Sequence, residues 1–244
     1  TRMTGFNMVA STNVQECYDM ALFSHILALK TSLPVLHFFD GFRTSHEIQK
    51  VAPIDVELIK SIYPYNKVYE FKNRALTPTK PVQRGTAQNP DVFFQTREAC
   101  NSLYNNVYPM AVETLKDIEK ITGRHYAPYE YYGASDAEFV IVSMASSIET
   151  IKETCDYLTK QGKKVGVVNV RLYRPFFADK FCEVLPKTVK KIAVLDRTKE
   201  NGSLGEPLYL DVCGAIKEYR QDISVIGGRY GLGGKEFNLS HVNA

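Results

Sequence analysis

The sequence predicts an α/β fold in which short buried strands alternate with amphipathic helices. Several apolar runs have strand length and lie between polar turns, as in strands covered on both faces by helices. The stretches between these runs carry apolar residues at helical spacing. The chain has 244 residues, 44% hydrophobic and 23% charged, which is ordinary globular composition for one large domain or two small ones.

The amino-terminal part begins strand, helix, strand. Phe6 to Ser11 is the first apolar run, an apolar stripe from Val14 to Lys30 predicts a helix, and Pro34 to Phe39 is a second strand. A short helix over 53–63, a long loop over 73–90 and a helix over 91–123 follow, and Gly123 is the expected end of that helix.

The carboxyl-terminal part shows the clearest alternation. Strands are predicted over 138–144, 164–172, 191–198 and 222–231, with helices between them, which indicates a doubly wound, mostly parallel sheet. The aromatic segment 125–136 before it reads as a connector. Three hydroxyl residues, each followed three positions later by Glu or Gln, predict capping boxes at helix starts: Thr12, Ser146 and Ser203.

Composition excludes several classes of function. A formal net charge of +3 without a basic cluster argues against a nucleic-acid partner, and no apolar run reaches the roughly 20 residues of a membrane span. The five cysteines stand singly, and no His or Cys spacing fits a metal site. We therefore expect no metal site and no bound cofactor in this chain.

Candidate site residues lie in loops at the carboxyl ends of strands, where α/β sheets place their ligands. The loop after the second strand offers a set suited to substrate binding or to an interface: Asp40, Arg43, Thr44, Ser45, His46 and Glu47. From spacing alone these two roles weigh equally. Loops after later strands add Ser146, Arg197 and Lys199. No pattern of a catalytic nucleophile is present, so no catalytic residue is assigned.

A family resemblance extends over nearly the whole chain, from Val14 to Phe237. It is carried, in order, by VQECYDMA, HFFDGFRTSHEIQKV, RGTAQNPDVFFQTREA, VIVSMASSIETI, VRLYRPF, VLDRTKE, LYLDVC and GGRYGLGGKEF. These strings resemble consecutive parts of pyruvate:ferredoxin (flavodoxin) oxidoreductases. The resemblance implies the back half of a thiamine-fold domain over 1–95, a connector over 96–136, and a domain similar to the transketolase C-terminal domain over 137–244.

The resemblance further implies a large parent enzyme that oxidatively decarboxylates pyruvate to acetyl-coenzyme A. The parent would use thiamine diphosphate, Mg²⁺ and iron–sulfur clusters, be a homodimer in the cytoplasm, and pass electrons to ferredoxin or flavodoxin. The residues that contact thiamine and pyruvate would lie before Thr1 or in later domains. This chain is then expected to be an inactive scaffold that contacts the remaining domains of the parent.

Three alternatives stay open. The parent could be a pyruvate:NADP oxidoreductase with a fused flavin reductase, and the compartment a hydrogenosome-like or mitochondrion-like organelle. The carboxyl-terminal domain could instead be an independent coenzyme- or nucleotide-binding module. The third alternative is a dimerisation unit that uses the aromatic connector and the proline-rich loop.

Overall fold

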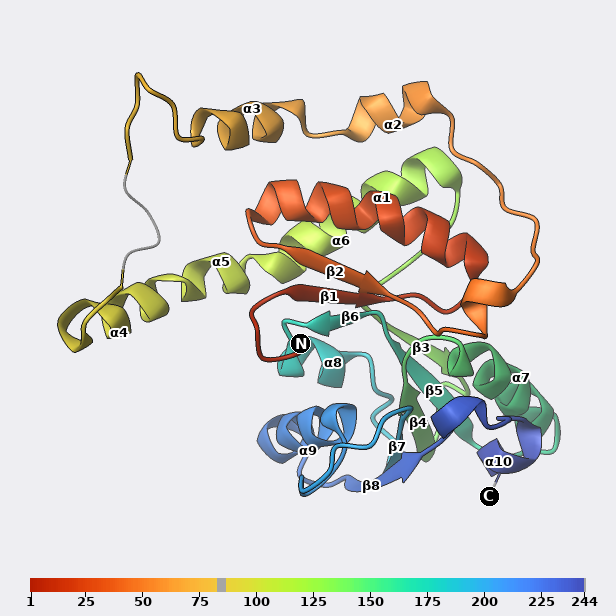
Figure 1. Ribbon diagram of the computed structural model, residues 1–244. Coiled ribbons are helices and arrows are strands. Elements are labelled where there is room, and N and C mark those ends of the chain that lie inside the picture. The colour runs from red at the N-terminus through yellow and green to blue at the C-terminus, as the bar shows by residue number, and fades with distance from the viewer. Residues whose placement is uncertain (83–86, 244) are drawn as a thin grey trace.

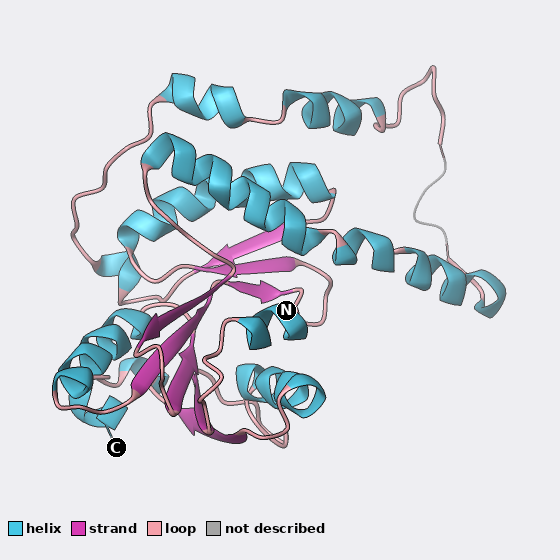
Figure 2. Cartoon of the chain, turned by 180° about the vertical axis from the view of Figure 1, so that it is seen from behind, coloured by secondary structure: helices cyan, strands magenta, loops and turns pink. Residues whose placement is uncertain are grey.

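The computed structural model describes residues 1–82 and 87–243. Within this part the strands form two neighbouring sheets, one of three strands in the order β2-β1-β6 and one of five in the order β3-β5-β4-β7-β8 (Figure 1). Helices cover both sheets, as the view from behind also shows (Figure 2). The predicted α/β class is confirmed.

The amino-terminal half packs two helices on one face of the small sheet. β1 (Asn7–Ala10) and β2 (Val35–Phe38) are parallel, and α1 (Val14–Thr31) and α6 (Val107–Thr122) lie over them. Val9, Phe23 and Leu115 belong to the core between these elements. Gly123 ends α6 with φ +71°, the left-handed conformation expected of it.

A set of short helices lies at the periphery between β2 and α6: α2 (Val56–Ile62), α3 (Tyr65–Asn73), α4 (Pro90–Ala99) and α5 (Asn101–Asn105). The helix expected over 91–123 is interrupted at Cys100 and Asn106. α3 was not expected, because none of its residues is buried and no apolar stripe marks it. Of the predicted loop over 73–90, residues 83–86 lie outside the described part.

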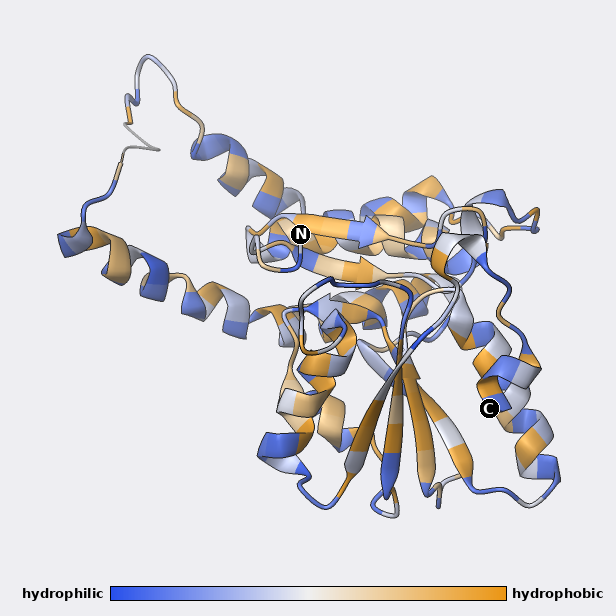
Figure 3. Ribbon diagram, turned by 60° about the horizontal axis from the view of Figure 1, so that its bottom comes forward, coloured by the Kyte–Doolittle hydropathy of each residue, from blue (hydrophilic) through white to orange (hydrophobic). Residues whose placement is uncertain are grey.

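The five-stranded sheet has the predicted doubly wound arrangement. β4 (Phe139–Ser143), β5 (Val165–Val170), β7 (Lys191–Asp196) and β8 (Ser224–Arg229) are parallel. α7 (Ser147–Lys160) and α10 (Leu239–Asn243) lie on one face, α8 (Ala178–Glu183) and α9 (Pro207–Tyr219) on the other. The strands are mostly apolar (Figure 3).

Two strands differ from expectation. β3 (Tyr129–Gly133) forms within the predicted connector and adds to β5 as an antiparallel edge strand; its tyrosines are residues that favour β structure. The strand expected over 164–172 breaks at Arg171, and β6 (Leu172–Arg174) pairs antiparallel with β1. The amino-terminal and carboxyl-terminal halves therefore share the three-stranded sheet. Apolar periodicity predicts a strand but does not identify its partner.

The predicted capping boxes are wrong. The α1 N-cap is Asn13, whose side chain accepts from the Glu16 amide at 2.9 Å, and Ser146 makes no cap bond. At α9, the buried Asp196 carboxylate accepts from two first-turn amides instead. The Thr12 hydroxyl donates instead to the Glu16 side chain in the first turn of the same helix, and the Ser146 hydroxyl donates to the distant Asp40. No helix in the described residues combines the length and apolarity needed to cross a membrane.

The edge pairing of β3 leads to a stability prediction. Gly133 has φ +129°, and a Cβ there would lie 2.6 Å from the Gly166 Cα. We expect Gly133→Ala to lower the free energy of unfolding by about 1–3 kcal/mol in denaturant titrations, because the strain falls on backbone. Gly214→Ala, inside α9 with open space around it, is the control and should raise it by about 0.5–1 kcal/mol. Equal changes in the free energy of unfolding for the two variants would contradict the prediction that Gly133 cannot accept a side chain.

Candidate functional site at the junction of the two sheets

The carboxyl ends of the parallel strands meet the amino-terminal half at one junction. β4 and β7 are neighbours in the sheet, but the chain runs from β4 to β5 on the opposite side, so the winding direction switches between β4 and β7. Such switch points are the usual ligand sites of open α/β sheets. The hydroxyl of Ser143, at the end of β4, donates to the Leu195 carbonyl of β7 at 3.2 Å and holds the strand ends together.

A cavity of about 550 Å³ lies at this junction. The amino-terminal half contributes polar side chains from the start of α1 and from the loop after β2: Thr12, Asn13, Arg43 and Glu47. The carboxyl-terminal half contributes side chains from the loops after β4, β7 and β8: Ser146, Arg197, Tyr230 and Lys235. Both halves are thus needed to form its walls.

Asp40 joins two groups of candidate residues. Its carboxylate accepts hydrogen bonds from the Ser146 amide at 2.8 Å and from the Ser146 hydroxyl, and it pairs with Arg197 at 3.0 Å. Arg197 also donates to the Gly231 carbonyl at 3.2 Å. One carboxylate from the loop after β2 therefore binds the loops after β4 and β7.

The other candidates of the loop after β2 have different surroundings. Arg43 lines the cavity and pairs with Glu236 at 3.0 Å, while Glu47 accepts from Gln49. The Ser45 hydroxyl lies 2.8 Å from the His46 ring, which is exposed and stacks on Phe42. Thr44 is buried. His46 is therefore not brought to the cavity wall.

Lys199 lies apart from this cluster. Its ammonium is 3.7 Å from Glu206 near the start of α9, and it does not line the cavity. Asp196, the last residue of β7, is buried and accepts hydrogen bonds from two α9 amides. Burial raises the pKa of this carboxyl, although the two amides lower it.

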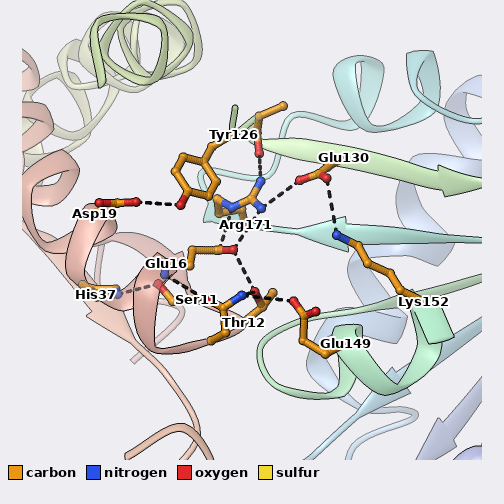
Figure 4. Close-up of polar contacts among 12 residues, drawn as sticks. Ser11, Thr12, Glu16, Asp19, His37, Tyr126, Glu130, Glu149, Lys152 and Arg171 are labelled. Atoms are coloured by element: carbon orange, nitrogen blue, oxygen red, sulfur yellow. Dashed lines mark hydrogen bonds and ion pairs between the residues drawn. The ribbon is translucent and has the colours of Figure 1, made fainter. Parts of the chain in front are cut away.

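A buried ion-pair network next to the cavity was not expected (Figure 4). Arg171, only 3% exposed, follows β5 and donates to both Glu16 carboxylate oxygens, at 2.7 and 3.2 Å. It also donates to Glu130 at 2.9 Å and to the Ala127 carbonyl. Glu16 accepts in turn from the Thr12 hydroxyl at 2.8 Å. Glu16 belongs to α1, so this network joins the two halves.

A second ion pair lies beside it. Arg124 binds the buried Asp19 carboxylate through two nitrogens, at 2.6 and 2.8 Å, and the Tyr126 hydroxyl donates to the same carboxylate at 2.7 Å. The Arg171 guanidinium lies over the Tyr126 ring at 5.2 Å. The aromatic connector is thus fixed between α1 and β5.

The charges in this network stabilise one another. Burial alone raises the pKa of the Glu130 carboxyl, but Arg171 and Lys152 lower it more, and the net shift is downward. Burial alone lowers the pKa of Arg171, but Glu16 and Glu130 raise it above its ordinary value. Glu130 and Arg171 are therefore both charged at neutral pH.

One signal in the sequence could have located this network. An arginine within a run of buried strand residues needs an opposite charge, because an unpaired buried charge is very costly. Arg171 lies between Val170 and Leu172 in such a run, and Glu16 and Asp19 interrupt the apolar part of α1. Their pairing depends on tertiary structure, so the sequence indicates the requirement without identifying the partners.

The polar groups near the junction are arranged to bind one another. The Ser11 hydroxyl lies 2.7 Å from the His37 ring, but Ser11 has no exposed surface for a substrate to reach. Burial raises the pKa of the Cys17 thiol to about 11, so it stays protonated at neutral pH. In the described residues, no three His, Cys, Asp or Glu side chains lie close enough to hold a metal ion. This chemistry suits an interface.

Family comparisons divide the chain in the same order as its two halves. A model described as pyruvate flavodoxin/ferredoxin oxidoreductase, thiamine diphosphate-binding, matches residues 1–116. The model of the pyruvate:ferredoxin oxidoreductase core domain II matches residues 137–242. The chain belongs to the pyruvate:ferredoxin (flavodoxin) oxidoreductase family.

Curated relatives of this family match the chain end to end. Pyruvate:ferredoxin oxidoreductase of Moorella thermoacetica is 54% identical over 100% of this chain and 21% of its own length. Pyruvate dehydrogenase [NADP(+)], mitochondrial, of Euglena gracilis is 48% identical over 100% of this chain and 14% of its own. The chain thus spans about a fifth, or less, of the length of these relatives.

A solved structure supports the fold. The 2-oxoglutarate:ferredoxin oxidoreductase of Magnetococcus marinus superposes on 97% of this chain and 41% of its own, with a TM-score of 0.52 and 17% identity. At that identity the likeness shows the fold.

The buried ion pair joins the two regions that the family models match. Glu16 lies in the region matched by the first model, and Arg171 lies in the region matched by the second.

The contacts of Asp40 generate a prediction for the junction. Asp40→Ala removes the acceptor of Ser146 and the partner of Arg197, so we expect the free energy of unfolding to fall by about 1–3 kcal/mol in denaturant titrations. Glu47→Ala, in the same loop but exposed, is the matched control, with an effect within about 0.5 kcal/mol. An Asp40 variant as stable as the control would show that this contact does not hold the junction.

Proposed function

We propose that this chain acts as part of a pyruvate oxidoreductase, which oxidatively decarboxylates pyruvate to acetyl-coenzyme A and passes electrons to ferredoxin or flavodoxin. Its own contribution is a scaffold and an interface with the remaining domains of the enzyme. The observation that carries the proposal is the 54% identity to the Moorella thermoacetica oxidoreductase along the whole chain.

The paired charges at the junction support the scaffold role. Ser146 and Arg197 both bind Asp40, and the ion pairs around Arg171 lie in the interior. Side chains that are paired in this way hold loops in place. A catalytic side chain, in contrast, must be free to exchange a proton with a substrate or to form a bond to it. We therefore assign these candidates to the interface between the two halves.

We propose that this chain does not form a complete thiamine diphosphate site by itself, although residues 1–116 match the thiamine diphosphate-binding family model. Thiamine supplies the carbanion chemistry of such enzymes, and Mg²⁺, which takes oxygen ligands such as carboxylates, holds the diphosphate. The free cysteines Cys17, Cys100, Cys155, Cys182 and Cys213 stand singly, whereas an iron–sulfur cluster is usually held by four thiolates. We propose that other parts of the enzyme supply both kinds of site.

The electron acceptor of the parent enzyme could be NADP(+) in place of ferredoxin or flavodoxin. The Euglena gracilis relative, 48% identical, is named as an NADP(+)-dependent mitochondrial enzyme, which supports NADP(+) as the acceptor and a mitochondrion-like location. Other relatives, at similar identity, are named as flavodoxin enzymes of bacteria such as Escherichia coli, which supports flavodoxin as the acceptor. We propose the cytoplasmic ferredoxin or flavodoxin enzyme, a homodimer, as the parent.

A second candidate function rests on the cavity at the switch point. Its volume of about 550 Å³ and its polar walls would admit part of a coenzyme or nucleotide. Calorimetric titration of the chain with coenzyme A, NADPH and thiamine diphosphate tests this candidate. Saturable heat with any of them favours a binding module, and flat titrations favour the scaffold.

The scaffold proposal predicts that the 244-residue chain alone does not turn over pyruvate. The assay contains pyruvate, coenzyme A, thiamine diphosphate, Mg²⁺ and a viologen dye, and the family-length enzyme carrying this segment is the positive control. We expect dye reduction with the family-length enzyme and only background with the 244-residue chain. Reduction above background by the short chain would overturn the scaffold role.

A further inference from the structure

Two consecutive helices extend from the body of the molecule. α4 and α5, residues 90–105, form a projecting arm that continues outward from α6 (Figures 1 and 2). The arm is anchored at its inner end, where the Tyr104 hydroxyl donates to the Gly5 carbonyl at 2.9 Å. Within the described chain, the main contact of α4 is with α5. The outer helix therefore has little tertiary support.

The arm carries large apolar side chains that nothing in the described chain covers. Phe94 is 70% exposed, Phe93 52% and Val92 47%, and none of the residues of α4 is buried. The apolar turns of α4 alternate with polar ones along its length (Figure 3). Adjacent exposed aromatic residues are typical of protein interfaces.

The length of α4 strengthens this argument. α4 has 10 residues, and isolated helices shorter than about 12–15 residues are marginal in water. Helices of this length usually depend on packing of an apolar face against another element. The short length of α4 and its exposed phenylalanines therefore both indicate that the arm packs against a partner.

We propose that the projecting arm docks against an apolar surface on the part of the family-length polypeptide that lies outside this segment. This chain spans 21% of the length of the Moorella thermoacetica relative, so most of the surface of such an enzyme is contributed by other regions. The inference rests on the proposed function, because the partner is the remainder of that enzyme. The aromatic connector is a weaker candidate, since its Tyr126 and Tyr129 already pack within the chain.

Hydrogen exchange tests the proposal. The amides of residues 91–99 are compared in the 244-residue chain and in the family-length enzyme that carries this segment. We expect exchange at least about a hundredfold slower in the family-length enzyme, because docking closes the local opening of α4. Equally fast exchange in both proteins would overturn the proposal.

A second copy of the segment is an outcome that the same experiment detects. If α4 in the 244-residue chain becomes protected as its concentration rises about a hundredfold, the arm binds another copy, and the proposal fails. If exchange is fast in a family-length enzyme that turns over pyruvate, the docking proposal alone fails. The failure of the docking proposal is thus distinguishable from failure of the proposed function.

Variants of the family-length enzyme make the test specific. Arg97 lies in α4 and offers a trypsin site. Phe93→Asp and Phe94→Asp should undock the arm and speed cleavage after Arg97 at least about tenfold, without unfolding a core to which neither side chain belongs. Tyr157→Asp, an exposed aromatic on α7, is the matched control and should leave cleavage unchanged. Cleavage unaffected by either arm variant would contradict the proposal.

Discussion

The structure depends on the pairing of one buried guanidinium with two carboxylates. Arg171 lies where the chain leaves β5 in one sheet and begins β6 in the other, and its side chain reaches Glu16 of α1. Burying a charge is costly unless it is paired and hydrogen-bonded, so neither half can bury its charge without the other. The pairing therefore couples the strand crossover, the start of α1 and the connector at Glu130.

The candidate site is a consequence of this coupling. With α1 fixed by Glu16, the loop after β2 comes to the carboxyl ends of β4 and β7, where Asp40 binds Ser146 and Arg197. The switch point of the sheet is often a ligand site in other α/β proteins. In this chain the amino-terminal half lies against it. The polar groups at this switch point are largely hydrogen-bonded or ion-paired with one another. Such pairing suits a segment that holds its two halves in place.

Sequence patterns predicted what depends on local periodicity and chemistry. The parallel strands, the stripes of α1 and α6, and the end of α6 at Gly123 follow from apolar spacing and backbone conformation. Strand-end rules selected Asp40, Ser146 and Arg197 separately, and the structure brings them into contact. The Arg171 network and the pairing of β6 with β1 join residues far apart in the sequence, and no local pattern specifies such partners.

The central claim is that Arg171 and Glu16 stabilise the chain as a unit, and a double-mutant cycle tests it most directly. Arg171→Met, Glu16→Gln and the double variant are compared by denaturant unfolding. Arg171→Met leaves the buried Glu16 carboxylate without its cation and should cost about 3 kcal/mol or more, whereas Glu16→Gln leaves Arg171 paired with Glu130 and should cost less. The account predicts that the double variant costs about 2 kcal/mol less than the sum of the two single variants. Costs that add within about 0.5 kcal/mol would contradict it.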